Sequence, residues 1–155
     1  MSESIADRLA ARSIVLPEAA PPAANYRPWV VTGNQLFISG QLPMKDGKIV
    51  HTGHLGRDHD VASGKEAARL CAINILAQAN AALSGGFEQI VNLVRINGFV
   101  ASMPDFTDQH LVLNGASDLL AEILEGRGQH TRLAIGAAVL PLNAAVEIDA
   151  IFEIV

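Results

Sequence analysis

The feature that most constrains this chain is the C-terminal run VEIDAIFEIV, residues 146–155, where apolar side chains recur at every second position. A period of two is that of a β-strand, because successive side chains point to opposite faces of a sheet. One face of this strand is apolar throughout: Val146, Ile148, Ala150, Phe152 and Ile154. The opposite face is part acidic and part apolar: Glu147, Asp149, Ile151, Glu153 and Val155. A half-apolar face calls for a cover from outside the chain, so the pattern predicts an oligomer.

Two helices are expected to cover the apolar face. Ser63-x-x-Glu66 predicts a capping box at the start of a long helix. A second helix is predicted from a cap at Asp105 or Thr107 to about Leu124. Two helices of this length cover one face of a sheet and leave the other bare.

The N-terminal part of the chain has a different character. Residues 3–12 predict a short amphipathic helix with Ile5, Leu9 and Ala10 facing inward. The four prolines of LPEAAPPAANYRP, residues 16–28, block both helix and central-strand pairing. This segment is therefore predicted to cross the surface in extended form.

The remaining β-rich runs complete the expected order of elements. WVVTG and NQLFISG predict a hairpin that turns at Gly33-Asn34. Further strands are predicted at 48–51, 89–100, 131–139 and 144–154. The order β-β-(β)-α-β-α-β-β predicts an α+β fold, a mixed sheet with two helices packed on one face.

Composition excludes several classes of protein. Half of the 155 residues are hydrophobic and 17% are charged, the opposite of a disordered chain. The net charge of −5 and the lack of a basic run argue against nucleic acid as a partner. No apolar run reaches membrane length, and the charged N-terminus is unlike a signal peptide. Cys71 is the only cysteine, so we expect no internal disulfide and a cytoplasmic location.

Three short motifs carry a family resemblance. LFISGQLP after the first strand, DF before the second helix and R…LP…VEIDAI at the end resemble the RidA/YjgF/YER057c/UK114 family of reactive-intermediate deaminases, formerly called the endoribonuclease L-PSP family. We therefore expect an N-terminal helix and proline-rich arm, residues 1–24, followed by a RidA-like domain, residues 25–155. The extra helix and the TGHLG loop resemble the longer branch of the family.

The resemblance implies a chorismate-mutase-like fold in a homotrimer with the sheets inside and ligand clefts between neighbouring subunits. It also implies a deaminase of the 2-iminobutanoate/2-iminopropanoate type. Such enzymes hydrolyse 2-aminoacrylate and related enamines or imines to 2-keto acids and ammonia. No cofactor and no metal is expected, because the carbon of an imine is already electrophilic.

Catalytic and binding residues follow from the same resemblance. Arg132 matches the arginine that holds the substrate carboxylate, a task suited to a planar, permanently charged guanidinium. Glu147 matches the glutamate that positions the attacking water, with a pKa tuned by burial and by Arg132. Ser39 would help to place that water. The backbone of Gly40 would contact substrate, and Tyr26 matches a pocket tyrosine.

The chain departs from the family pattern at three places. His130-Thr131 precedes Arg132 where the family usually has Pro-Ala. Ala134 replaces a frequent cysteine, whose contact with substrate is made through the backbone. Asn114 lies one helical turn further from the DF pair than the family's pocket asparagine, which roughly preserves the helix face.

Each of these assignments has a purely structural alternative. Arg132 and Glu147 could form a structural ion pair, and an outward-facing strand acid is usually just solvated. Tyr26 could dock a loop onto the sheet, while Ser39 and Gly40 could serve only as turn residues.

The loop HTGHLGRDHD invites a metal interpretation that its spacing does not support. His51, His54 and His59, with Asp58 and Asp60 nearby, follow no metal-site pattern, and we expect no bound metal. Cys71 falls on a helix face and is expected in the core rather than at a reactive site.

Three functions remain open: an enamine/imine deaminase, a non-catalytic or chaperone-like trimer that binds small carboxylates, and an endoribonuclease. The acidic net charge counts against the last.

Overall fold

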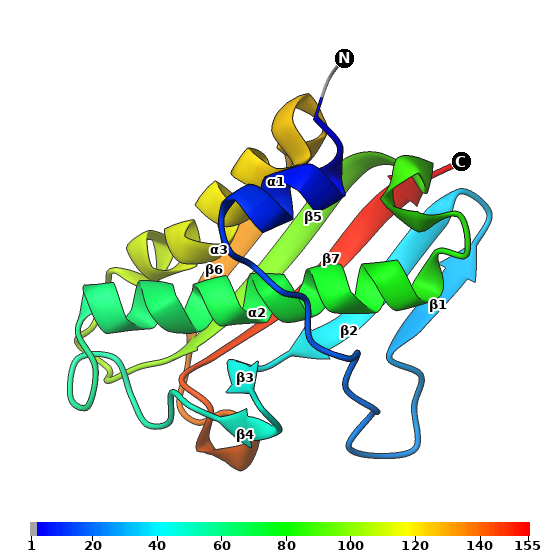
Figure 1. Ribbon diagram of the computed structural model, residues 1–155. Helices are drawn as coiled ribbons and strands as arrows, with labels where there is room; N and C mark the ends of the chain where they lie inside the picture. The colour runs from blue at the N-terminus through cyan, green and yellow to red at the C-terminus, as the bar shows by residue number, and fades with distance from the viewer. Residues whose placement is uncertain (1–2) are drawn as a thin grey trace.

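Five strands form the main sheet of the computed structural model, which describes residues 3–155, in the order β1-β2-β7-β5-β6. The strands are β1 Trp29–Thr32, β2 Gln35–Gln41, β5 Ile90–Ala101, β6 Thr131–Ala137 and β7 Val146–Ile154. All neighbours are antiparallel except β5 and β6, which are parallel (Figure 1). A separate small hairpin pairs β3 Met44–Lys45 with β4 Lys48–Ile49. The mixed sheet and the hairpin at Gly33-Asn34 confirm the sequence prediction.

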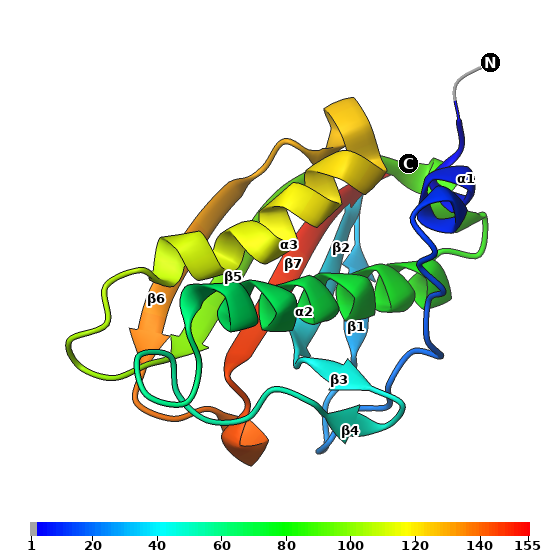
Figure 2. The ribbon, with the colours of Figure 1, turned by 60° about the vertical axis from the view of Figure 1, so that its left-hand side comes forward.

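The long helices lie on one face of this sheet, and Figure 2 shows the other face without a helix. The helices are α1 Ile5–Ala11, α2 Val61–Ala82 and α3 Gln109–Leu124. Short 3-10 turns follow at η1 Gly86–Gln89, η2 Glu125–Gly128 and η3 Pro141–Asn143. Because α3 connects β5 to β6, these two strands can run parallel at the edge of the sheet. The α+β fold class is confirmed.

The core lies between the helices and the sheet. Along β7 the residues alternate strictly between buried and half-buried, as its sequence pattern predicts. Phe152 is fully buried in this core, and the alternate positions of β7 face the bare side. The alternation therefore assigns each β7 side chain to one face, which decides where Glu147 points.

The predicted helix caps are wrong. The cap of α2 is Asp60, whose side chain accepts a hydrogen bond from the Ser63 backbone at 2.8 Å. The Ser63 hydroxyl instead contacts His59 Nδ1 at 2.7 Å. For α3 the cap position is Asp108, without a side-chain hydrogen bond, rather than Asp105 or Thr107. Aspartate and serine both cap helices well, so the local sequence does not choose between neighbouring candidates.

Helix α1 packs onto the end of α3 through Arg8, a buried arginine that the sequence pattern did not predict to face inward. Arg8 is 3% exposed, while Ala10, predicted to face inward, is exposed. The Nε of Arg8 donates to the Ile123 carbonyl at 2.6 Å, and its Nη1 forms an ion pair with the Glu125 carboxylate at 3.3 Å. The last carbonyls of a helix lack partners within it, so a cation placed there is stabilising. Within the described residues, no helix is both long and apolar enough to cross a membrane.

Candidate functional site

Arg132 lies on β6, the outer strand of the sheet, and its side chain reaches helix α3. Its Nη1 donates to Asn114 Oδ1 at 2.9 Å and to Ser117 Oγ at 3.1 Å, and its Nη2 donates to the His110 carbonyl at 3.0 Å. All three acceptors are neutral. Across residues 3–155, no carboxylate forms an ion pair with Arg132. The guanidinium is therefore held in place with its charge uncompensated, as an anion site requires.

The local sequence explains how this arginine is held. Asn114 and Ser117 are three residues apart on α3, so they share one helix face toward β6. The Ser117 hydroxyl also contacts His130 Nε2 at 2.9 Å, which ties the start of β6 to the helix. The structure thus joins Arg132 with Asn114, two residues that the sequence analysis named separately as site candidates. Ser117 was missed, although its spacing from Asn114 was the available signal.

Ala134 follows Arg132 by two residues and lies on the same face of β6. It is half-buried against the core and stands opposite Gly98 of β5. Because β6 is an edge strand, the backbone groups on its outer side have no strand partner among residues 3–155. These free groups are the ones that a ligand or another chain can reach.

Glu147 lies on β7 and faces the bare side of the sheet, against Gly40 of β2. A Cβ atom at position 40 would collide with the Glu147 carboxylate, so the glycine provides the space that the acid occupies. The two residues line a cavity of about 230 Å³ together with Phe99, Leu140 and Asp149. The carboxylate is therefore at the wall of an open hollow rather than in bulk solvent.

The pKa of Glu147 is raised, first by burial and second by the negative charge of Asp149. Asp149 itself accepts a hydrogen bond from Asn97 Nδ2 at 2.7 Å, and Asn97 in turn accepts one from Arg95 Nε at 2.8 Å. Arg132 was expected to influence this pKa, but among residues 3–155 the charge that acts on Glu147 is that of Asp149, which raises the pKa. A carboxylate with a raised pKa is a better proton acceptor.

Tyr26, Ser39 and Gly40 lie together at a second cavity, beneath the proline-rich segment. The Ser39 hydroxyl donates to the Arg27 carbonyl at 2.8 Å. The hydroxyl proton of Ser39 is therefore used in this bond, and Oγ can still accept a hydrogen bond from a water. Gly40 is a lining residue of both this cavity and that of Glu147.

Arg132 and Glu147 point to opposite faces of the sheet. Arg132 stands opposite Ile96 of β5, and Glu147 stands opposite Phe99. Positions three apart on a strand alternate in face, and β6 and β7, which flank β5, are separated by roughly 10 Å. A structural ion pair between Arg132 and Glu147 is thus wrong within one chain. We call Arg132, Asn114, Ser117 and Ala134 the arginine half-site, and Glu147, Gly40, Ser39 and Tyr26 the glutamate half-site.

The histidine loop forms hydrogen bonds of its own. His54 Nε2 contacts the Ala138 carbonyl at 2.6 Å, and His59 Nε2 contacts that of Thr52 at 2.6 Å. In residues 3–155 no three metal-binding side chains converge. Cys71 is buried as predicted, and burial raises its thiol pKa well above the ordinary value.

Comparison with known proteins places this geometry in a family. Residues 6–154 match the family described as "YjgF/chorismate mutase-like, putative endoribonuclease". The chain belongs to the YjgF/RidA family. Protein TCP17 of Trypanosoma cruzi is 46% identical over 154 residues, which is 99% of this chain and 96% of that protein.

Solved structures agree with this membership. Atu1372 from Agrobacterium tumefaciens, a protein of unknown function, is 54% identical with a TM-score of 0.90, over 97% of this chain and 91% of that one. RidA from the Antarctic bacterium Psychrobacter is 26% identical with a TM-score of 0.61, over 88% of this chain and 94% of that one. This YjgF/RidA-family chain therefore matches the Atu1372 backbone more closely than that of RidA.

Proposed function

We propose that this protein hydrolyses small enamines or imines that carry a carboxylate, of the 2-aminoacrylate type, to 2-keto acids and ammonia. The observation that carries the proposal is the Arg132 guanidinium, fixed by three neutral acceptors and without a counter-ion in the described part of the chain, residues 3–155. Such a group favours a carboxylate ligand that binds with two parallel hydrogen bonds. Family membership supports the same chemistry.

Glu147 would act as the general base of the reaction. It would take a proton from a water held against Ser39 while the water oxygen adds to the imine carbon, and pass that proton to the imine nitrogen. The resulting carbinolamine then loses its hydroxyl proton to Glu147 as the C–N bond breaks. The nitrogen takes this proton and leaves as ammonia. Burial and Asp149 raise the pKa of Glu147, which suits a group that both takes and returns a proton.

We further propose that the site is shared between copies, because each chain holds its two half-sites on opposite faces of the sheet. Phe37, Leu133 and Ile135 are each 39% exposed on the bare face, a surface that further copies would cover. In a closed ring of three chains, the arginine half-site of one copy would meet the glutamate half-site of the next. The sheets would then lie inside a homotrimer.

A mixing experiment tests both parts of this proposal. Ammonia release from freshly generated 2-aminoacrylate should fall by ~10²–10⁴-fold in Glu147→Gln, the usual effect of losing a general base. Arg132→Ala should lose both binding and turnover, at a cost of roughly 2–5 kcal/mol. When the two inactive variants are unfolded and refolded together, about a quarter of the interfaces should carry both native residues and activity should return.

The outcomes separate the alternatives. No recovery on mixing, from variants that are each inactive, would place the site within one chain. Wild-type activity in both single variants would mean that neither residue is catalytic. Carboxylate binding without any turnover by the wild-type protein would favour a non-catalytic binding trimer.

Endoribonuclease activity is the second candidate, because the family description names it. The net charge of −5 opposes binding to a polyanion. RNA cleavage that is unchanged in Arg132→Ala would point to a contaminating nuclease.

A further inference from the structure

His130, two residues before Arg132, stands where the family sequence usually has proline, and the proposed reaction does not use it. It is half-buried between η2 and β6, and each of its ring nitrogens contacts another group. Nδ1 lies 2.7 Å from the Gly128 carbonyl oxygen, and Nε2 lies 2.9 Å from Ser117 Oγ. A Cβ atom on Gly128 would come within 2.8 Å of the α3 backbone, so this glycine packs directly on the helix. Its carbonyl is therefore a fixed anchor for the histidine ring.

The two contacts decide where the protons lie. A carbonyl oxygen only accepts, so in neutral His130 the ring proton is on Nδ1 and Nε2 is an acceptor. Ser117 therefore donates its single hydroxyl proton to Nε2 and turns its lone pairs toward Arg132, whose Nη1 lies 3.1 Å from Oγ. Each group thus donates to the next, from the guanidinium through the hydroxyl and the imidazole to the carbonyl. We call this series of hydrogen bonds the relay.

The guanidinium of Arg132 uses three of its five N–H groups on α3. Both hydrogens of Nη1 go to Asn114 and Ser117, and one hydrogen of Nη2 goes to the His110 carbonyl. Among residues 3–155, one N–H on Nε and one on Nη2 stay available. These neighbouring nitrogens can hold a carboxylate with two parallel hydrogen bonds. The direction of that pair follows from the bonds that Nη1 makes.

Ser117 holds Nη1 only while its oxygen faces the guanidinium. A serine on a helix without such a partner can turn its hydroxyl toward the carbonyl one turn earlier. The ring of His130 removes this freedom, because it takes the proton and leaves the lone pairs facing Arg132.

We propose that His130 is a positioning residue of the arginine half-site, which holds the guanidinium plane of Arg132 in the orientation that meets a substrate carboxylate. It acts through Ser117 and does not touch the substrate. The inference rests on the proposed function for the carboxylate ligand. It gives a role to the position at which this sequence departs from the family pattern, since a proline there has no side-chain group to take the serine proton.

Two conservative variants each keep one of the two bonds. His130→Gln places its carboxamide oxygen as many bonds from the backbone as Nε2, so it can still accept the proton of Ser117. His130→Asn places its NH₂ group as many bonds from the backbone as Nδ1, so it can still donate to Gly128 but leaves Ser117 without its acceptor. A merely structural histidine would be replaced equally well, or equally badly, by both.

The readout is hydrolysis of 2-iminopropanoate, generated in situ from alanine by an amino-acid oxidase. We expect His130→Asn to raise KM by about 2–10-fold, the range of one hydrogen bond, with kcat near the wild-type value. His130→Gln should restore KM to within about twofold of wild type. In a Ser117→Ala background, His130→Asn should raise KM no further, because the relay is already cut. Equal effects of Gln and Asn, an unchanged KM in His130→Asn, or additive effects with Ser117→Ala would overturn the proposal.

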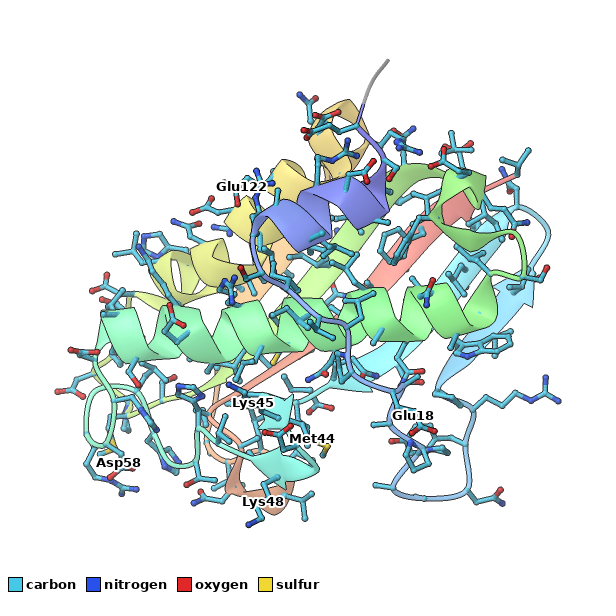
Figure 3. All side chains as sticks on the ribbon, in the orientation of Figure 1. Glu18, Met44, Lys45, Lys48, Asp58 and Glu122 are labelled. Atoms are coloured by element: carbon cyan, nitrogen blue, oxygen red, sulfur yellow. The ribbon has the colours of Figure 1, made fainter. Side chains whose placement is uncertain are left out.

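His59 provides a matched control, because its ring also bridges a carbonyl and a serine. Its Nε2 contacts the Thr52 carbonyl at 2.6 Å and its Nδ1 contacts Ser63 Oγ at 2.7 Å. No arginine donates to that serine among residues 3–155. Figure 3 shows Asp58 of the same loop at the start of α2, whereas His130 precedes β6. His59→Asn should leave KM unchanged, and a rise equal to that in His130→Asn would overturn the specific role.

Two measurements that need no turnover separate a failure of the relay from a failure of the proposed reaction. If the wild-type protein does not hydrolyse 2-iminopropanoate, the deaminase proposal fails. The relay is then judged by calorimetry with 2-oxobutanoate, for which His130→Asn should weaken the affinity by about 2–10-fold and His130→Gln by less than about twofold. Equal affinities, or no binding by any of the three proteins, would overturn the role of His130.

The tautomer is the second measurement. Long-range proton–nitrogen NMR spectra of the wild-type protein, labelled with ¹⁵N in histidine, should show His130 with its proton on Nδ1. A proton on Nε2 instead would reverse the direction of the relay and overturn the proposal, whatever the activity.

Discussion

The two faces of the sheet differ in how far their apolar side chains are covered within one chain. On the helix side, the apolar positions of β7 are buried beneath α2 and α3, and Phe152 is fully buried. On the bare side, Ile151 remains half-buried, and Asp149 and Asn97 pair with each other rather than with a covering layer. The helix side therefore stabilises the fold, while the bare side holds Glu147 and is the face on which we propose that another copy packs. The same strand serves both purposes because its side chains alternate.

The largest effect should come from truncating neighbouring residues on β7. Phe152→Ala should lower the free energy of unfolding by ~3–5 kcal/mol, because it opens a cavity in the core. Ile151→Ala should cost about 1 kcal/mol or less in the isolated chain. Denaturant unfolding of both variants measures the difference. A cost for Ile151→Ala that grows with protein concentration would place another copy on the bare face, whereas equal costs at high dilution would contradict the comparison.

Replacing one glycine by alanine on each side of the sheet should have a medium effect, on stability at the helix side and on turnover at the bare side. A Cβ at Gly115 would collide with the Lys65 backbone carbonyl where α3 crosses α2. Gly115→Ala should therefore destabilise by ~1–3 kcal/mol, since backbone must shift. A Cβ at Gly40 meets only the flexible Glu147 carboxylate, so Gly40→Ala should keep most of the stability and reduce turnover. Thermal unfolding together with ammonia release distinguishes the two, and normal turnover in Gly40→Ala would contradict the assigned position of Glu147.

The smallest effect concerns the pH dependence of stability on the bare side. Because the pKa of Glu147 is raised above 4.5 in the folded protein, the folded state keeps this proton to a higher pH than the unfolded chain. This stabilising contribution is fully present below the unfolded pKa and is lost as the pH rises through the folded pKa. Glu147→Gln cannot lose it, so the variant should gain stability relative to wild type from about pH 4.5 upward and then level off.

Unfolding curves at one protein concentration and a series of pH values would measure this gain. Asp149→Asn removes the neighbouring negative charge and should shrink the pH-dependent loss of stability without abolishing it, because burial is the larger cause. A wild-type stability that rises with pH relative to Glu147→Gln would reverse the sign and contradict the raised pKa.

Local sequence patterns predicted much of the fold. The alternation of residues 146–154, the turn at Gly33-Asn34 and the end of α3 at Leu124 were all predictable, because each depends on neighbours in sequence. Caps were not, since Asp60 and Ser63 are equally suited and the surrounding fold decides which is used. The burial of Arg8 was also hidden, because its partners at Ile123 and Glu125 lie over a hundred residues away.

The sequence by itself determined which residues are candidates for the site and which of them share a helix or strand. Arg132, Glu147, Gly40 and Asn114 were each named as site candidates from the family resemblance. The structure groups them into two pairs, Arg132 with Asn114 and Glu147 with Gly40. Only the tertiary structure decided that these pairs face opposite sides of one sheet. The physical reason is the pairing register of β6 with β5, because a shift of one residue would move Arg132 to the other face of the sheet. That register depends on the packing of α3, the helix that connects the two strands.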